Sequence, residues 1–208
     1  MCIRDRGGGD AHLVSDPAQP SAQRRARGGR PVTAATGPEQ VARATDAVIG
    51  YLTENGLEWD RGSRDGEIVL TLPGEHKQKI VVSLLVRPDH TSVTSFLIRN
   101  PDENHEAVYR YLLRRNLRLP GLAYAIDDAG DVFLRGQIPT DALDATRLDE
   151  ALGVVHQASD TVFDELLVLG FFTSMQREWD WRISRGESTR NLEAFRHLLE
   201  RDGDPPPQ

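Results

Sequence analysis

The sequence predicts an α+β domain in which helices pack on an antiparallel sheet of about five to six strands. Three runs of alternating apolar residues lie between positions 68 and 98, and the short turns between them are typical of antiparallel neighbours. A second pair of alternating runs, 122–126 and 132–138, is joined by a hairpin loop containing Asp and Gly. Stretches with helical periodicity precede, separate and follow these strands, which gives the order α-β-β-β-α-β-β-α.

The first helix is predicted over residues 38–55, because Pro38 suits the first turn of a helix and Gly56 suits its end. A short strand at 57–59 and a turn at 61–66 follow it. The apolar residues of this helix recur with the spacing of one helical face: Val41, Ala44, Val48, Ile49 and Leu52.

The central strands are predicted at 68–72, 80–86 and 93–98. Each strand alternates apolar core positions with a second set of positions, and several members of the second set are also apolar, including Val81 and Phe96. We therefore expect both faces of the sheet to be at least partly covered.

The next helix is predicted to start at Asn100, whose side chain can cap the helix while Pro101 occupies the first turn. Asp102 and Glu103 favour the positive end of the helix dipole. The Leu-Pro-Gly segment at 119–121 ends this helix.

The longest helix is predicted to begin near Asp144, and Gly170 is expected to break or bend it. Its apolar seam advances in steps of four and three residues: Leu148, Leu152, Val155, Ser159, Val162, Leu166 and Leu169. Val154, Phe163 and Leu167 widen this seam. The resulting stripe is broader than a coiled-coil seam and suits a helix lying on a sheet.

A helical extension is expected over 171–201, in which Ser188 caps a final helix. The inward face of that final helix comprises Leu192, Phe195, Leu198 and Leu199. Residues 1–37 carry six Arg against three Asp, and we expect a disordered tail that is partly a sequencing artefact; the alternative is a basic arm for an acidic partner. Residues 202–208 are expected to be a second disordered tail.

Charge and cysteine content exclude several classes of protein. The net charge is −7, so most of the surface repels nucleic acid and anionic lipid. The single cysteine, Cys2, allows neither an internal disulfide nor a cysteine-based metal site. The sequence contains neither an apolar run of membrane-spanning length nor the apolar segment of a secretory signal. We therefore expect a cytoplasmic protein that binds neither nucleic acid nor membranes.

Catalytic and cofactor motifs are missing from the sequence, including a phosphate-binding loop, a dinucleotide fingerprint and a nucleophile elbow. His156 and Asp160 lie one helical turn apart but have no third ligand, so a surface pair is preferred to a metal site. Asp127, Asp128 and Asp131 suit an ordinary turn better than a cation site. We expect no metal ion, no cofactor and no enzymatic activity.

Arginines recur every four residues at Arg110, Arg114 and Arg118. Such a stripe either forms a solvated helix face that complements the helix dipole or binds an anionic group. Together with Tyr124 and Arg135, it defines an alternative function, in which a regulatory subunit senses an anionic small ligand in an arginine-lined pocket.

An aromatic cluster follows the predicted domain and is the candidate surface for a partner protein. It comprises Phe171, Phe172, Met175, Trp179, Trp181 and Arg182. In a helix, residues 179 and 181 point to different sides, so one tryptophan can pack while the other sits at an interface. The alternative is a packed C-terminal lid, because aromatic side chains bury large areas either way.

Several stretches of the chain carry a resemblance to a known family. They are Val108–Asn116, Leu122–Asp127, Val132–Leu134 and Ile138-Pro139. Over residues 38–170 the chain resembles the YbjN-like family, whose members are labelled sensory transduction regulators. Residues 176–179 and 185–188 resemble an extension found in actinobacterial members.

The resemblance implies the fold of type III secretion chaperones and a dimer that holds an extended segment of another protein, and it supplies no catalytic residue. We therefore expect a non-enzymatic protein-binding module, a chaperone-like adaptor or regulator that acts as a homodimer. Either a sheet edge pairs with a client strand, or a helix groove takes an amphipathic helix.

Overall fold

The computed structural model describes residues 37–189 and Arg196. The chain divides into two units, Met1–Ala34 and Ala35–Gln208, and every described residue belongs to the second unit. The expected tails, apart from Gly37, and the expected final helix after Thr189, apart from Arg196, lie outside the described residues.

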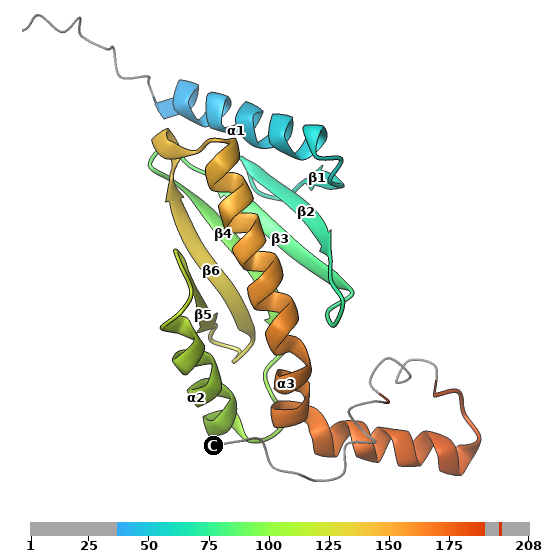
Figure 1. Cartoon of the computed structure of the whole chain (residues 1–208). Coiled ribbons are helices and arrows are strands. Elements are labelled where there is room, and N and C mark those ends of the chain that lie inside the picture. The colour runs from blue at the N-terminus through green and yellow to red at the C-terminus, as the bar shows by residue number, and fades with distance from the viewer. Residues whose placement is uncertain (1–36, 190–195, 197–208) are drawn as a thin grey trace, which may run out of the picture. The chain divides into compact units, whose positions relative to one another are not determined.

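The structure has the predicted α+β architecture with a six-stranded antiparallel sheet (Figure 1). Its elements in chain order are α1 (Gly37–Glu54), β1 (Trp59–Arg61), β2 (Glu67–Pro73), β3 (Lys79–Val86), β4 (His90–Ile98), α2 (His105–Asn116), β5 (Leu122–Ile126), β6 (Val132–Pro139), a 3-10 turn (Thr140–Ala142) and α3 (Ala145–Arg185). The strand order across the sheet is β1-β2-β3-β4-β6-β5. Since α2 lies between β4 and β5 in the chain, the β5–β6 hairpin returns with β6 beside β4 and leaves β5 as an edge strand.

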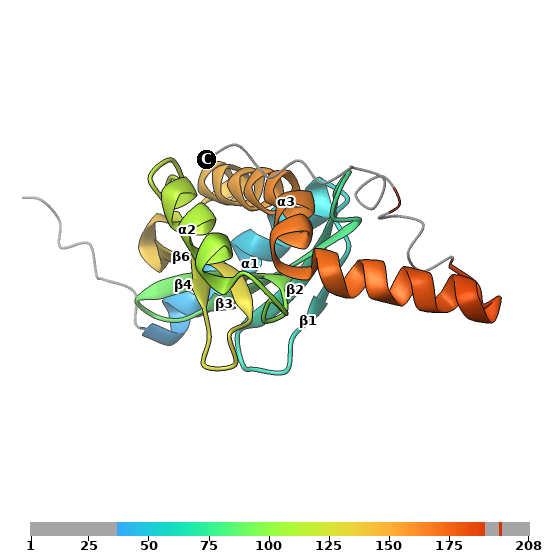
Figure 2. The same cartoon turned by 90° about the horizontal axis from the view of Figure 1, so that it is seen from below.

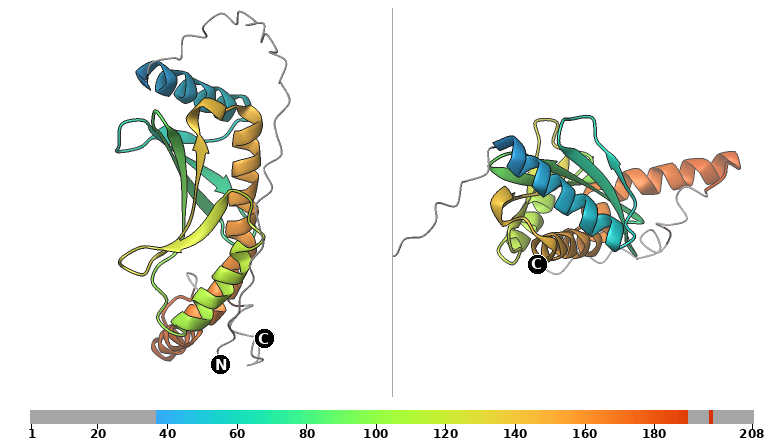
Figure 3. Two further views of the ribbon diagram at one scale, coloured as in Figure 1. Left: turned by 90° about the vertical axis from the view of Figure 1, so that its left-hand side faces the viewer. Right: turned by 90° about the horizontal axis from the view of Figure 1, so that it is seen from above.

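The helices α2 and α3 lie on one side of the sheet, and α1 crosses the end of the sheet beside the start of α3 (Figure 3). The inward side chains of the strands form one core with the apolar faces of the helices, among them Val48 of α1, Val108 of α2 and Val162 of α3, each of which is fully buried. Within the described residues, no helix covers the opposite face, where Val81 and Phe96 remain exposed. This face is therefore covered only in part: Leu85 of β3 is 6% exposed there, whereas Val81 and Phe96 are exposed.

Contacts between strands replace a covering helix on the open face. Phe96 and Phe133 face each other across β4 and β6 with a ring-centroid distance of 5.5 Å. A β-bulge between Phe96 and Ile98 then shifts the register, so that Leu97 and Ile98 are both buried. The simple alternation predicted for 93–98 ends at this bulge, because the extra residue turns the following side chain toward the core.

The predicted start of α2 at Asn100 is wrong, since α2 begins at His105 after Asn104 in a left-handed conformation with φ 53°. The backbone N–H of Asn100 donates to Asp131 Oδ1 at 2.7 Å, which ties this loop to the β5–β6 hairpin. Arg99 donates to both carboxylate oxygens of Asp102 at 2.5 and 2.7 Å. The long-range contact with Asp131 and the local Arg99–Asp102 pair thus hold residues 99–102 as a loop before α2.

The helix α3 begins near Asp144, as predicted. The side chain of Asp144 caps it by accepting a hydrogen bond from the backbone N–H of Arg147 at 2.8 Å. The predicted seam is confirmed as the buried face from Leu148 to Leu166. The helix continues without a break into the segment expected as an extension and ends at Arg185, before Gly186 with φ 65°.

The same helix changes direction beyond the end of the sheet, beside the loop that precedes α2 (Figure 1). There the carbonyl of Gly170 accepts hydrogen bonds from the backbone N–H groups of Asp102 and Glu103, at 2.9 and 3.2 Å. The backbone N–H of Thr173 donates to Glu103 Oε1 at 2.7 Å, and the side-chain amide of Asn104 donates to the carbonyl of Leu169. Groups from another loop thus enter the hydrogen-bond ladder of the helix, which is a known cause of bending.

Candidate functional site

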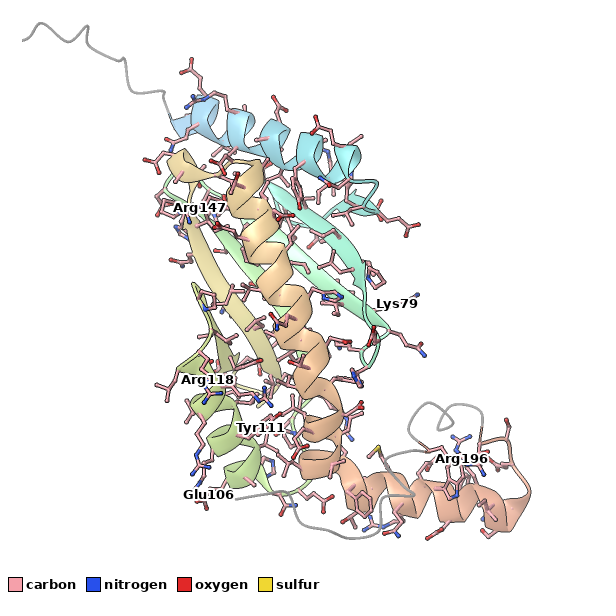
Figure 4. The ribbon with its side chains drawn as sticks, in the orientation of Figure 1. Lys79, Glu106, Tyr111, Arg118, Arg147 and Arg196 are labelled. Carbon is pink, nitrogen blue, oxygen red and sulfur yellow. The ribbon has the colours of Figure 1, made fainter. Side chains whose placement is uncertain are left out.

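A groove of about 1020 Å³ lies between α2 and α3. Figure 2 shows the two helices side by side, and Figure 4 shows Tyr111 pointing from α2 toward α3. Side chains of α2 form one wall of the groove, side chains of α3 form the other, and Tyr124 of β5 contributes to the floor. We call this feature the arginine groove, because Arg110, Arg114, Arg115 and Arg118 all line it.

The predicted arginine stripe forms the outer edge of the α2 wall. Arg110 pairs with Glu106 one turn earlier on the same helix. Within the described part of the chain, Arg114 and Arg118 have no ion-pair partner. Two guanidinium groups are therefore available to an acidic ligand.

Deeper in the groove, Arg115 lies over the ring of Tyr111, with 4.6 Å from the guanidinium carbon to the ring centroid. Burial raises the pKa of Tyr111, although the positive charge of Arg115 opposes this change. The tyrosine ring is thus covered by a side chain of its own helix.

Tyr124 forms part of the floor and is almost completely buried. Its hydroxyl donates to the carbonyl of Ala158 on α3 at 2.8 Å, and burial raises its pKa to about 12. The side chain of Asn116 accepts from the backbone N–H of Tyr124 at 2.7 Å and donates to its carbonyl at 3.3 Å. The hydroxyl of Tyr124 therefore joins β5 to α3, and Asn116 occupies the middle of the β5 edge.

The α3 wall repeats with the same spacing as the α2 wall. Gln157, Thr161 and Glu165 are spaced by four residues and line the groove together with Val154 and Leu169. Only Glu165 on this wall carries a charge. The groove therefore has one strongly basic wall, one mainly neutral polar wall and an apolar floor.

Arg135, the remaining residue of the small-ligand alternative, does not line the groove. It lies on β6 opposite Ala123 and Thr94, whereas its neighbour Leu134 lies opposite Tyr124. Since successive strand residues point to opposite faces, Arg135 lies on the open face of the sheet. The structure brings Arg110, Arg114 and Tyr124 together and leaves Arg135 apart.

The six residues of the predicted partner surface do not share one environment. Phe171 is 6% exposed and lies in the core, where the Arg99 guanidinium contacts its ring at 4.7 Å. Phe172, Met175 and Trp179 are half-buried.

The other two members lie further along α3. Trp181 is 42% exposed, with the Arg185 guanidinium 5.0 Å from its ring centroid. Arg182 donates to Glu178 Oε1 and to the carbonyl of Ser188. Trp181 therefore remains the one strongly exposed aromatic side chain of the six.

A second surface of α2 was not identified from the sequence. Tyr109, Leu113 and Leu117 are spaced by four residues and line a shallow hollow of about 660 Å³ on the outer side of the helix. Leu113 is 65% exposed and Leu117 is 87% exposed. The sequence does contain a pattern that indicates this surface, because apolar residues with the same four-residue spacing lie beside the arginines. We call these three residues the α2 apolar stripe.

The His156–Asp160 pair holds a turn. His156 Nε2 lies 2.8 Å from the carbonyl of Pro73, and Asp160 Oδ1 accepts from the backbone N–H groups of His76 and Lys77. One further turn along α3, Asp164 contacts the ring of His76 at 2.8 Å. The three side chains on one face of α3 therefore fix the β2–β3 turn.

The acidic hairpin also bonds to its own backbone and to a neighbouring loop. Asp127 Oδ1 accepts from the N–H groups of Ala129 and Asp131, and Asp131 accepts from Asn100. Among the described residues, no group of three or more His, Cys, Asp or Glu side chains is arranged to hold a metal ion. None of the helices in that part of the chain has the length and apolar character of a membrane span.

Comparison with known proteins identifies a family and several relatives. A family model named YbjN, described as "Putative bacterial sensory transduction regulator", matches residues 26–168. An uncharacterized protein of Mycobacterium tuberculosis is 50% identical over 137 residues, which are 66% of this chain and 75% of the relative. An uncharacterized protein of Mycobacterium leprae is 46% identical over 145 residues, covering 69% of this chain and 79% of the relative.

Similar solved structures include two complexes from type III secretion. The Yersinia pestis chaperone SycH, in complex with a partner fragment, has 20% identity and a TM-score of 0.43, covering 57% of this chain and 98% of that chain. The ExoU–SpcU heterodimer of Pseudomonas aeruginosa has 19% identity and a TM-score of 0.42, covering 55% of this chain and 93% of that chain.

Proposed function

Because the chain belongs to the YbjN family, we propose that it is a protein-binding adaptor or regulator that acts as a dimer in the cytoplasm and has no enzymatic activity. The description of the family as a regulator agrees with a role in binding another protein. The absence of a nucleophile, base and orienting group assembled in the groove agrees with a binding role for the described residues.

The observation that carries this proposal is the gathering of exposed large apolar side chains on two helical surfaces. Leu113 of α2 and Leu117, which directly follows this helix, are 65% and 87% exposed. Near the end of α3, Trp181 and Ile183 are 42% and 59% exposed. Exposed apolar patches rimmed by charged residues are typical of surfaces that contact other polypeptides.

The α2 apolar stripe is the proposed dimer contact. Its three side chains are spaced by four residues, so they form a ridge along one side of the helix. In a two-fold dimer the same ridge on both copies meets itself, and helix ridges pack into each other's grooves. Tyr109 adds an aromatic side chain to this ridge, and aromatic residues are enriched in interfaces.

The end of α3 is the proposed contact for the partner protein. Its members are Phe172, Met175, Trp179, Trp181 and Arg182; Phe171 is excluded because it lies in the core. Trp and Arg are the side chains that most often dominate binding energy in interfaces.

Helical surfaces are preferred to sheet edges as the binding mode. Strand addition requires a row of free backbone N–H and C=O groups. At the β5 edge, Asn116 already bonds both backbone groups of Tyr124. At the other edge, β1 has only three residues.

Sedimentation of the full chain with and without Leu113→Glu/Leu117→Glu tests the dimer. The wild-type protein is expected at twice the chain mass of 23.2 kDa, and the double variant at the chain mass. Ile126→Glu is the matched control, because Ile126 is also exposed but lies on β5 outside the stripe. A wild-type monomer, or a dimer that the double variant preserves, contradicts this contact.

A further inference from the structure

We propose that the arginine groove binds an acidic amphipathic helix supplied by a protein partner. This inference rests on the proposed function, since it specifies the chemistry of a partner that the adaptor binds. The arginine groove adjoins the α2 apolar stripe, with which it shares Leu117, and it is separate from the end of α3.

The spacing of the arginines indicates a ligand whose negative charges are distributed along a line. Arg110 and Arg114 lie one turn apart on α2, ~6 Å along the helix axis, and Arg118 follows in the turn just beyond the end of the helix at Asn116. A single phosphate or carboxylate contacts two neighbouring guanidinium groups and cannot contact all three. Acidic side chains at positions i, i+4 and i+8 of a bound helix have the same ~6 Å repeat.

The α3 wall and the floor of the groove also suit a bound helix. Gln157, Thr161 and Glu165 repeat with the same period on α3, so both walls suit a helix that runs along the groove. Val154 and Leu169 line the groove beside the almost fully buried Tyr124. A helix with one apolar stripe and one acidic edge therefore places its apolar side on the floor and its acids against the arginine wall.

A helix suits this groove better than an extended segment, because both walls are themselves helices. Their backbone N–H and C=O groups are bonded within each helix and offer nothing to a strand. A buried extended segment then leaves its own backbone groups unsatisfied, which is costly. A helical ligand brings its backbone hydrogen bonds with it.

A protein ligand is favoured over a nucleic acid by charge and by the state of the tyrosines. The whole chain has a net charge of −7, and the carboxylates of Glu106 and Glu165 lie beside the arginines. Single-stranded nucleic acid requires exposed aromatic faces on which bases stack. In this groove, Arg115 covers Tyr111 and Tyr124 is buried.

The test is a selection from a displayed library of random segments of about 16 residues, the length of helix that spans the ~22 Å from Val154 to Leu169. The full-length protein is the bait, and binding of the most enriched segment is then measured by fluorescence anisotropy. We expect enriched segments to carry Asp or Glu at i, i+4 and i+8 beside an apolar stripe. Arg114→Glu/Arg118→Glu is expected to weaken binding at least about tenfold, because two attractive pairs become repulsive.

Arg135→Glu is the matched control and is expected to leave binding unchanged, since Arg135 is exposed on the other face of the sheet. The inference is overturned if no segment is enriched or if the enriched segments lack acidic residues. It is also overturned if the double variant binds the segment as tightly as wild type. A labelled single-stranded RNA is measured in parallel. If it binds more tightly than the selected segment, and if the double variant abolishes that binding, the groove is a nucleic-acid site and the inference is overturned.

A photo-crosslinking residue at Trp181 of the full chain separates this inference from the proposed function. A protein crosslinked at that position from native lysate, together with a failed selection, removes the groove ligand and leaves the adaptor. If no protein is crosslinked and the selection also fails, both the groove ligand and the proposed adaptor function are contradicted.

Discussion

Asp160 shows how a buried charge organises a turn of the chain. Only 7% of this residue is exposed, yet its Oδ1 accepts from the backbone N–H groups of His76 and Lys77, both at 2.9 Å. Burial acts to raise the pKa of Asp160, but the backbone N–H groups of residues 75–77 hold it below its usual value. The carboxylate is therefore stabilised in its charged form and fixes the β2–β3 turn on α3.

Replacement of this side chain tests that role. Asp160→Ala leaves backbone N–H groups without their acceptor and is expected to lower the free energy of unfolding by about 1–3 kcal/mol. Urea denaturation measures the change. Asp128→Ala, in an exposed hairpin loop, is the matched control and is expected to stay within about 0.5 kcal/mol of wild type. Equal effects of the two variants would contradict the account.

Glu67 makes the stability of the protein depend on acid pH. Hydrogen bonds from Arg64 and Ser83 lower its pKa to about 2. In the unfolded chain a glutamate titrates near ~4.3, so the unfolded state takes up the proton first as the pH falls. The stability that Glu67 contributes is therefore full above the unfolded pKa and is lost as the pH falls toward 2.

Denaturation of wild type and Glu67→Gln between neutral pH and acid measures this contribution. We expect the wild type to lose more stability than the variant between pH ~5 and ~2. Parallel curves for the two proteins would show that Glu67 has the same pKa in both states.

At the scale of elements, the bend of α3 depends on the close contact at Gly170. A Cβ atom at this position would lie 3.0 Å from Cβ of Pro101, closer than ordinary contact. On the same helix, a Cβ at Gly153 would meet no atom within 4 Å. Substitutions at these two positions can therefore be compared. Both replace a glycine in the same helix, but only the one at Gly170 introduces a close contact.

Gly170→Val is expected to destabilise the protein by about 1–3 kcal/mol, because the added methyl groups meet the rigid ring of Pro101. Gly153→Val is the matched control and is expected to be neutral or stabilising, since valine is a better helix former than glycine. Thermal unfolding compares the two. A neutral Gly170→Val would show that the loop before α2 moves freely relative to α3.

The boundaries of elements were predictable where local patterns decide them. The helix α3 starts near Asp144 as predicted, because its start depends on neighbouring residues, with Asp144 accepting from the backbone N–H of Arg147. Asn100 does not cap α2, which begins only at His105, and its backbone N–H bonds to Asp131 of the distant β5–β6 hairpin. The bulge at Phe96 was likewise unpredictable, since it depends on pairing with β6.

At the scale of the whole molecule, the sequence identified half of the candidate groove. The four-residue repeat of Arg110, Arg114 and Arg118 was visible as a stripe on one helix. Its opposite wall was not, because Gln157, Thr161 and Glu165 meet the stripe only through packing of α2 against α3. Arg135 was grouped with them by residue type, and strand register places it on the other face.

The uneven coverage of the sheet explains where contacts with other chains are expected. The helices bury one face of the sheet. Four exposed large apolar side chains lie at the end of α2 and the end of α3, namely Leu113, Leu117, Trp181 and Ile183, whereas Val81, Phe96 and Ile126 lie on strands. These surfaces lie outside the core, so substitutions there are expected to change binding while leaving the fold intact.

The most direct test of the central claim is photo-crosslinking of the full chain in native lysate. Benzoylphenylalanine replaces Trp181 in one sample and Arg135, on the open sheet face, in a control sample. The account predicts that one protein other than the chain itself is crosslinked in stoichiometric amount at Trp181 and not at Arg135. Crosslinking to no such protein, or to the same proteins at both positions, would contradict the claim that this chain is an adaptor that binds a partner protein through α3.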